Sequence, residues 1–304
     1  MNDIAIKAIS LTKTYTRNRA AVKSVDFTIK GEGITGLVGR NGAGKTTLLK
    51  LCAGLLSTTD GELEVWGEDP LDNPPVLSRL FYSYHNLKYN RLLKLRDILH
   101  DYNVFFTTFD LEFAQKLASY FDLPLKQRYD TLSQGMASTF NFICGLACRA
   151  PLTMFDEPTL GMDVTVRKTV YEILLREYNE YPRTVIISSH LMSELEGILT
   201  DVLLIDEGKL VLHDTIDNLR QSAYLLEGGR EALDRFCVGK EVIYQKQGET
   251  GSVAVVFGHA DEGHIQSAQS LGLKLSAVRP EDLCVYLTRE SKEGELECLW
   301  QKTN

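Results

Sequence analysis

Long apolar runs are absent from this 304-residue sequence. No stretch approaches the about 20 consecutive apolar residues that a membrane-spanning helix requires. The first residues, MNDIAIKAIS, carry an acid early and contain no uninterrupted apolar segment, so we expect no signal peptide. If the protein works at a membrane, another molecule has to anchor it there.

An excess of basic residues is also lacking. The chain has 33 Lys and Arg residues against 41 Asp and Glu residues, a formal net charge of -8. Non-specific affinity for duplex DNA depends on clustered Lys and Arg side chains. The charge balance therefore argues against a protein that coats nucleic acid, and we expect no nucleic-acid partner.

Paired cysteine motifs are missing too. The six cysteines form no CxxC pair and follow no regular spacing, which favours reduced thiols in a cytosol over a disulfide scaffold. Cys144 and Cys148 stand at the i,i+4 spacing of one helix face. A metal ion there would need two further ligands that the neighbourhood does not offer, so buried packing is the better interpretation.

Apolar patterns predict the elements of the first half of the chain. Residues 4–10 (IAIKAIS) and 22–29 (VKSVDFTI) alternate apolar and polar residues, as half-buried strands do. Residues 33–39 (GITGLVG) then run apolar into a glycine loop. From about residue 92 to 149 the spacing becomes helical and aromatic residues are frequent, which indicates an inserted helical subdomain.

Short apolar runs follow this subdomain. LTMFDE, RTVIISSH and DVLLIDE are separated by amphipathic helices, the rhythm of a mostly parallel sheet that is covered on both faces. Past about Ala223 the order becomes strand, helix, strand, strand, helix, strand, with a final helix from Pro280. We therefore expect an α/β unit over residues 1–222, with the helical subdomain at about 92–150, and a small accessory α+β unit over residues 223–304.

A phosphate loop at residues 39–47 is the strongest local signal. Its sequence, GRNGAGKTT, fits the pattern G-x-x-x-x-G-K-[ST] between an expected strand and an expected helix. The glycines let backbone N–H groups turn toward one point at a helix N-terminus, where an anion binds. Lys45 would reach the β- and γ-phosphates, Thr46 would give a hydroxyl to Mg²⁺, and Thr47 would contact the α-phosphate. The expected nucleotide-binding residues of the loop are Gly39, Asn41, Gly42, Ala43, Gly44, Lys45, Thr46 and Thr47.

Two acidic residues end the run LTMFDE. Asp156 fits the carboxylate on the metal side, acting through water, and Glu157 fits the residue that polarises the attacking water. Two adjacent acids could merely cap a strand, but their place downstream of the phosphate loop favours the catalytic interpretation. His190, at the end of VIISSH, is placed to meet the γ-phosphate. We therefore expect a site for ATP and Mg²⁺ in which Glu157, His190 and Lys45 are catalytic.

A second anion site is predicted at TLSQGMA. Ser133 and Gly135 stand at the expected start of a long apolar helix, where a hydroxyl and backbone N–H groups can hold a phosphate. With these motifs in this order, the chain resembles the ATP-binding subunits of ABC transporters over about residues 3–222. The resemblance implies a P-loop NTPase cassette of the α/β class, with a mixed sheet core, an antiparallel β layer and the helical subdomain.

The resemblance also implies roles for particular residues. The signature stretch, LSQGM at residues 132–136, would face the nucleotide of an opposed subunit, so that two chains close around ATP as a homodimer or a heterodimer. Asp163 matches the family's D-loop, which links the two sites. Tyr15 matches the aromatic residue that stacks on adenine, although it could equally be a surface residue of a strand.

Two places depart from the family pattern. His85 stands where the family usually carries a glutamine that contacts the metal, and a neutral imidazole is a poor ligand for Mg²⁺. Asn86 keeps an amide oxygen one residue later, and His85 would then act on water or through hydrogen bonding. In the signature, Gln134 and Met136 replace a glycine and a glutamine. The residues whose chemistry is hardest to replace are all present, so we expect a site that hydrolyses ATP.

The function implied by the resemblance is that of an ATPase subunit, docked on a separate membrane permease at the cytoplasmic face of the cell membrane and working in export. A groove beside YSYHNLKYNRLL and the aromatic residues Tyr102, Phe105, Phe106 and Phe109 is the implied place for the permease's coupling helix, although the aromatics could equally fill the core of the subdomain. The alternatives are a non-transport ABC ATPase acting in translation or DNA metabolism, and a regulatory subunit whose residues 223–304 bind a ligand or a second subunit.

Overall fold

The chain forms two compact units, residues 1–213 and 214–304. The boundary falls within the strand β9 (Lys209–Thr215), whereas the apolar pattern placed it after residue 222. The computed structural model describes residues 4–16, 19–84, 87–247 and 251–288.

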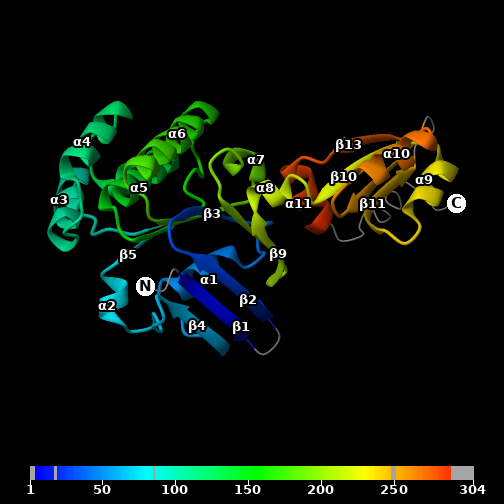
Figure 1. Ribbon diagram of the computed structural model, residues 1–304. Coiled ribbons are helices and arrows are strands. Elements are labelled where there is room, and N and C mark those ends of the chain that lie inside the picture. The colour runs from blue at the N-terminus through cyan, green and yellow to red at the C-terminus, as the bar shows by residue number, and fades with distance from the viewer. Residues whose placement is uncertain (1–3, 17–18, 85–86, 248–250, 289–304) are drawn as a thin grey trace, which may run out of the picture. The chain divides into compact units, whose positions relative to one another are not determined.

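Strands of the first unit form two sheets (Figure 1). They are β1 (Ile4–Thr16), β2 (Arg19–Lys30), β3 (Gly33–Val38), β4 (Asp60–Val65), β5 (Leu80–Tyr84), β6 (Leu152–Asp156), β7 (Thr184–Ser189) and β8 (Asp201–Asp206). The central sheet has the order β5-β6-β7-β3-β8-β9, and it is parallel from β5 to β8. The second sheet, β2-β1-β4, is antiparallel. The mixed central sheet and the antiparallel layer confirm the expected fold class.

The described part of the first unit has seven helices, some of which pack on the sheets and some on one another. They are α1 (Lys45–Cys52), α2 (Pro74–Leu77), α3 (Leu95–Phe105), α4 (Leu111–Tyr120), α5 (Gln134–Cys148), α6 (Val164–Glu180) and α7 (Met192–Leu195). Helix α1 packs between the two sheets, against β2, β4 and β6, and shares one apolar core with them. Helix α5 packs on β5 and β6 with α6 beside it, on the face away from α1 (Figure 1).

Helices α3, α4 and α5 pack on one another and form the helical subdomain. A partly buried cation ties it to α6. Arg149, just after α5, pairs with Asp110 (3.1 Å) before α4 and with Glu177 (2.8 Å) on α6, and it lies 3.6 Å from the ring centre of Tyr181. Because these groups are largely removed from water, loss of one charge would leave the others buried without compensation.

The second unit is a four-stranded antiparallel sheet with helices. Its elements are α8 (Ile216–Leu219), β10 (Ala223–Gly228), α9 (Arg230–Cys237), β11 (Glu241–Gln247), β12 (Ser252–Phe257), α10 (Glu262–Ser270), β13 (Lys274–Ala277) and α11 (Pro280–Thr288). The sheet order is β11-β12-β10-β13. An apolar cluster with Leu233, Phe236 and Ala268 joins α9 and α10 to the sheet, and Tyr286 of α11 stacks on Tyr244 of β11. The expected alternation of strands and helices is confirmed.

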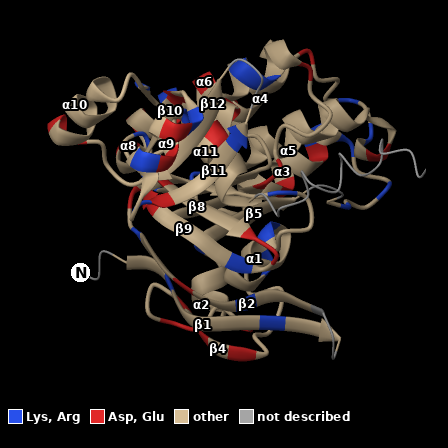
Figure 2. Ribbon diagram, turned by 90° about the vertical axis from the view of Figure 1, so that its right-hand side faces the viewer, with Lys and Arg blue, Asp and Glu red and all other residues tan. Residues whose placement is uncertain are grey.

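Charged residues of both signs are distributed over the elements of the structure. Figure 2 shows acidic and basic residues interspersed along the ribbon. Within the ranges given above, every helix is too short or too polar to span a bilayer. The described cysteines, including Cys144 and Cys148, are free thiols, and both of these lie in the apolar interior.

Gly145 tests how tightly α5 packs on the central sheet. A Cβ atom at this position would lie 2.5 Å from the ring of Phe155 on β6 and 2.9 Å from that of Phe81 on β5. We expect Gly145→Ala to lower the free energy of unfolding by about 1–3 kcal/mol, because the clash with two buried rings outweighs the better helix propensity of alanine. Urea unfolding of both proteins measures the difference.

The control is Gly197→Ala, because among the described residues, apart from its chain neighbours, no atom lies within 4 Å of a Cβ atom at that position. We expect this variant to unfold like the wild type. An unfolding free energy of Gly145→Ala equal to or above that of Gly197→Ala would show that the two rings move aside without cost.

Candidate functional site

The phosphate loop connects β3 to α1. Gly44 immediately precedes the helix with a φ of 112°, in the left-handed region that favours glycine. A Cβ atom there would lie 2.4 Å from the carbonyl oxygen of Ala21. No side chain of the described residues caps the start of α1, so its first N–H groups are available to an anion.

Lys45 is the first residue of α1, and only 6% of it is exposed. Its ammonium group donates to the carbonyl oxygens of Gly39 (2.7 Å) and Arg40 (3.2 Å). It also lies 3.2 Å from Oε1 of Glu157 in an ion pair. The structure thus brings the phosphate loop and the carboxyl end of β6 together.

Glu157 directly follows β6 and has a φ of 50°, which is uncommon for a residue with a side chain. Its Oε2 lies 2.9 Å from Nδ1 of His190, which directly follows β7. Because the two strands are parallel neighbours, their carboxyl ends meet at one edge of the sheet. Lys45 and His190, predicted from two other motifs, therefore each contact a different oxygen of Glu157.

Asp156, the last residue of β6, is buried and held by two hydroxyl groups. Ser188 donates to its Oδ1 (2.6 Å), and Tyr82 donates to its Oδ2 (3.4 Å). Burial, and then the neighbouring carboxylate of Asp156, raise the pKa of Tyr82 well above its usual value, so the phenol stays a donor. Sequence reasoning missed both partners, although a polar Ser188 inside an apolar run was a signal.

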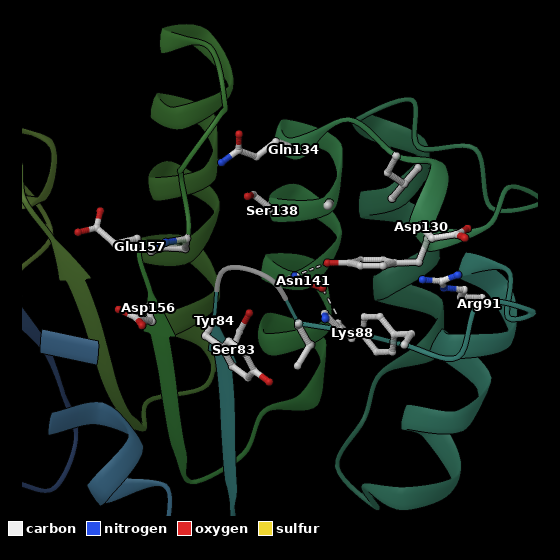
Figure 3. A pocket seen from close by; sticks show the side chains of 16 residues that line it. Ser83, Tyr84, Lys88, Arg91, Asp130, Gln134, Ser138, Asn141, Asp156 and Glu157 are labelled. Atoms are coloured by element: carbon white, nitrogen blue, oxygen red, sulfur yellow. Dashed lines mark hydrogen bonds between the residues drawn. The ribbon is translucent and has the colours of Figure 1, made fainter. Parts of the chain in front are cut away.

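Two cavities meet at Glu157. The larger, about 870 Å³, is lined by the phosphate loop and by Tyr15. The smaller, about 590 Å³, opens between β5, β6 and α5. Figure 3 shows Gln134, Ser138 and Asn141 along the side of α5 that faces this smaller cavity, with Asp156 and Glu157 on the opposite wall. Glu157 lines both cavities, so a ligand bound in either cavity would lie next to it.

Tyr15 lies near the end of β1, and 53% of it is exposed. Its hydroxyl lies 3.3 Å from the hydroxyl of Thr47 on α1. The ring therefore stands on the rim of the larger cavity, beside the helix that begins with Lys45. A flat, half-exposed ring in this position can stack on a nucleotide base.

The signature stretch forms the start of α5. The Ser133 side chain accepts the N–H of Met136 (3.3 Å) as the helix cap, and its hydroxyl is exposed. Neither Ser133 nor Gly135 is among the described residues that line the larger cavity. Asp163 caps α6 by accepting the N–H groups of Thr165 and Val166. Within one chain, the signature and the phosphate loop thus line separate surfaces.

The proposed magnesium ligands have the chemistry that the ion requires. Thr46 and Asp156 offer a hydroxyl and a carboxylate, and Mg²⁺ takes oxygen ligands and keeps several waters. Ser188 and Tyr82 already orient the carboxylate of Asp156. Among the described residues no group of three or more His, Cys, Asp and Glu side chains could hold a metal ion. His85 lies outside the described residues.

The aromatic residues of the helical subdomain divide between its core and its surface. Phe109 is buried, and the hydroxyl of Tyr102 lies 2.9 Å from that of Tyr89. Phe106 packs near Tyr102, whereas Phe105 is 80% exposed. The core interpretation therefore holds for Tyr102 and Phe109, and Phe105 is available at the surface.

Comparison with known proteins identifies relatives. The family described as "ABC transporter" matches residues 22–160. The bacitracin transport ATP-binding protein BcrA of Bacillus licheniformis is 31% identical over 230 residues, which cover 71% of this chain and 71% of the relative. The methionine import ATP-binding protein MetN of Clostridium acetobutylicum is 24% identical over 321 residues and covers 96% of this chain and 99% of the relative.

A solved structure shares the fold. The dimeric, post-hydrolysis state of the ATP-binding cassette MJ0796 bound to ADP and Pi superposes with a TM-score of 0.61 at 19% sequence identity. The match covers 69% of this chain and 98% of the cassette.

Proposed function

The chain belongs to the ABC transporter family and is an ATP-binding subunit with ATPase activity, and from this premise we propose that it dimerises around ATP and drives a separate membrane permease. Its place is then the cytoplasmic face of the cell membrane, where the permease anchors it. The observation that carries this proposal is the direct contact of Lys45, Glu157 and His190 at one edge of the sheet.

These contacts support a hydrolytic role for each residue. When ATP binds, its phosphates carry more negative charge than the carboxylate of Glu157. The ammonium group of Lys45 then exchanges its ion pair with Glu157 for one with the phosphates. The released carboxylate of Glu157 then takes a proton from the attacking water as the bond between the γ-phosphorus and ADP breaks. His190, next to Glu157, donates a hydrogen bond to the γ-phosphate.

Thr46 and Asp156 are the residues that would hold Mg²⁺, Asp156 through water. When bound, the ion neutralises charge on the β- and γ-phosphates. The donation from Ser188 supports this role, because it fixes one oxygen of Asp156 and so limits the rotation of the carboxylate.

The exposed signature supports a dimer. Ser133 and the N–H groups around Gly135 begin a 15-residue helix, whose N-terminus favours an anion. Since this surface is separate from the chain's own phosphate loop, the phosphate that it reads belongs to the ATP of an opposed subunit. The MJ0796 cassette forms a dimer in its solved structure, which supports the same arrangement here.

The smaller cavity is the proposed docking place of the permease. Lys88 and Arg91 line it and are exposed, and Glu157 forms part of its wall. A helix of the permease seated there would therefore lie next to the catalytic carboxylate. We propose export as the direction of transport, and the likeness to the Nod factor export ATP-binding protein I of Sinorhizobium fredii, 29% identical over 225 residues, supports it. The methionine import protein, 24% identical over 321 residues, represents the opposite direction among the relatives.

The test of the ATP-dependent dimer is the mass of Glu157→Gln in solution. The substitution keeps the ATP site but removes the proton acceptor, so the closed dimer should persist. Light scattering after size exclusion should show twice the monomer mass with Mg·ATP and the monomer mass without it.

Adding Ser133→Arg to Glu157→Gln should abolish the dimer, because a long cation then occupies the place of the γ-phosphate. The matched control is Ser119→Arg, which adds the same charge at an exposed position of α4 and should leave the dimer intact. A Glu157→Gln protein that binds ATP as a monomer would contradict the homodimer and direct the search to a heterodimer or to the permease.

Substitutions of Tyr15 test whether its ring stacks on the adenine base or is only a surface residue. Stacking of a base on an aromatic ring is worth roughly 1–3 kcal/mol, so Tyr15→Ala should weaken ATP binding by about 5- to 150-fold. Tyr15→Phe should retain most of the affinity, although it loses the contact with Thr47. Binding of a fluorescent ATP analogue measures both, and equal affinities of Tyr15→Ala and wild type would assign Tyr15 to the surface.

Charge reversal at Lys88 and Arg91 tests the docking place. The double variant, Lys88→Glu with Arg91→Glu, should lose co-purification with the membrane permease, because a permease helix that fits this rim would meet repulsion. ATP-dependent dimerisation should persist, since neither residue lines the larger cavity. Unchanged co-purification would exclude this surface.

A further inference from the structure

One hydroxyl group, that of Ser188, contacts both residues of the acidic pair. Ser188 lies on β7 directly opposite Asp156 in the parallel register, and it is fully buried. Its hydroxyl donates to Oδ1 of Asp156 (2.6 Å) and accepts the backbone N–H of Glu157 (2.9 Å). The side chain of Ser188 thus bridges β7 to the end of β6 at the point where the strand enters the site.

The bond to Asp156 restricts the carboxylate. A hydroxyl that donates to a charged oxygen at 2.6 Å forms a short, charge-assisted hydrogen bond. A serine hydroxyl has one hydrogen, and this bond uses it. Among the described residues, the second oxygen of Asp156 has the longer contact, 3.4 Å from the hydroxyl of Tyr82, so Ser188 is the stronger of the two restraints.

The bond from Glu157 restricts the backbone. Glu157 has a φ of 50°, a conformation that is unfavourable for a residue with a side chain and persists only where the surroundings hold it. Its N–H is directed at the oxygen of Ser188. The peptide unit before Glu157 is therefore held in the orientation that sends the side chain toward Lys45 and His190.

We propose that Ser188 is a positioning residue that aligns the acidic pair as one unit, with Asp156 turned toward Mg²⁺ and Glu157 turned toward the attacking water. The inference rests on the proposed function of these two residues. It follows that loss of the hydroxyl changes two separate properties, the Mg²⁺-dependent part of nucleotide binding and the rate of hydrolysis.

The test compares Ser188→Ala with variants that lack other buried hydroxyl groups. Tyr82→Phe removes a contact to Asp156 alone. Thr153→Val removes a buried hydroxyl from β6 that contacts neither acidic residue; it donates to the carbonyl oxygen of Ala150 and accepts a long bond of 3.4 Å from Arg183. Each protein is measured for kcat, for affinity of a fluorescent ATP analogue with and without Mg²⁺, and for its thermal unfolding midpoint.

We expect Ser188→Ala to lower kcat by about 10- to 100-fold, the usual effect of losing a group that orients a metal ligand. The affinity measured without Mg²⁺ should stay as in wild type, while the gain in affinity on adding Mg²⁺ should shrink. Tyr82→Phe should reduce that gain less, and Thr153→Val should leave it unchanged. Ser188→Thr keeps the hydroxyl and should keep both properties close to those of the wild type, and the thermal unfolding midpoint shows whether the added methyl group is tolerated.

The Glu157→Gln variant, used as a second genetic background, separates the effect of the bond to Asp156 from that of the bond to Glu157. In Glu157→Gln, where the proton acceptor is already lost, Ser188→Ala should lower the residual hydrolysis by a smaller factor than in the wild-type background, because only the contact with Asp156 is left to lose, and it should still reduce the gain in affinity on adding Mg²⁺. The inference is overturned if Ser188→Ala matches Thr153→Val in kcat and in Mg²⁺-dependent binding. A wild-type protein that fails to hydrolyse ATP would overturn the proposed function instead, and the binding measurements would still test the bond between Ser188 and Asp156.

Discussion

The ion pair between Lys45 and Glu157 is the contact on which the arrangement of the site depends. It joins the start of α1 to the end of β6 across 3.2 Å, and both side chains are largely removed from water. A buried charge without a partner is costly, so each group stabilises the other while no nucleotide is bound. In the proposed function the pair also links binding to chemistry, because a polyphosphate that attracts Lys45 would leave Glu157 with a free oxygen for water.

The surroundings of Glu157 extend this link to the signature. The carbonyl oxygen of Glu157 accepts the N–H of Leu160 (3.2 Å), and the carbonyl oxygen of Leu160 accepts the hydroxyl of Ser138 on α5 (2.8 Å). The start of α5 is therefore joined to the acidic pair through a short turn. A phosphate from a second subunit that pulls on this helix start would act on the chain's own Glu157 as well.

Local sequence patterns predicted the parts of the site that one segment builds alone. The phosphate loop is one such part, because its glycines and Lys45 stand within nine consecutive residues. The meeting of Glu157 and His190 was predictable from strand ends, since parallel strands end at one edge. The role of Ser188 could not be predicted in this way. Its two hydrogen bonds depend on the register between β6 and β7, and the sequence of neither strand determines that register. The φ of Glu157 is likewise a product of its neighbours, since glutamate has no preference for the left-handed region.

In the proposed dimer, the separation of the two anion sites gives the nucleotide a mechanical role. The Ser133 oxygen accepts a weak bond of 3.3 Å from its own helix, while its exposed hydroxyl hydrogen remains able to donate to a phosphate outside the chain. Such a donation requires a γ-phosphate, so it is lost on hydrolysis and departure of the phosphate. Two chains held together by these contacts are stable only while ATP is intact. Closure and reopening then follow from chemistry at Glu157, which is the property that a subunit driving a permease needs.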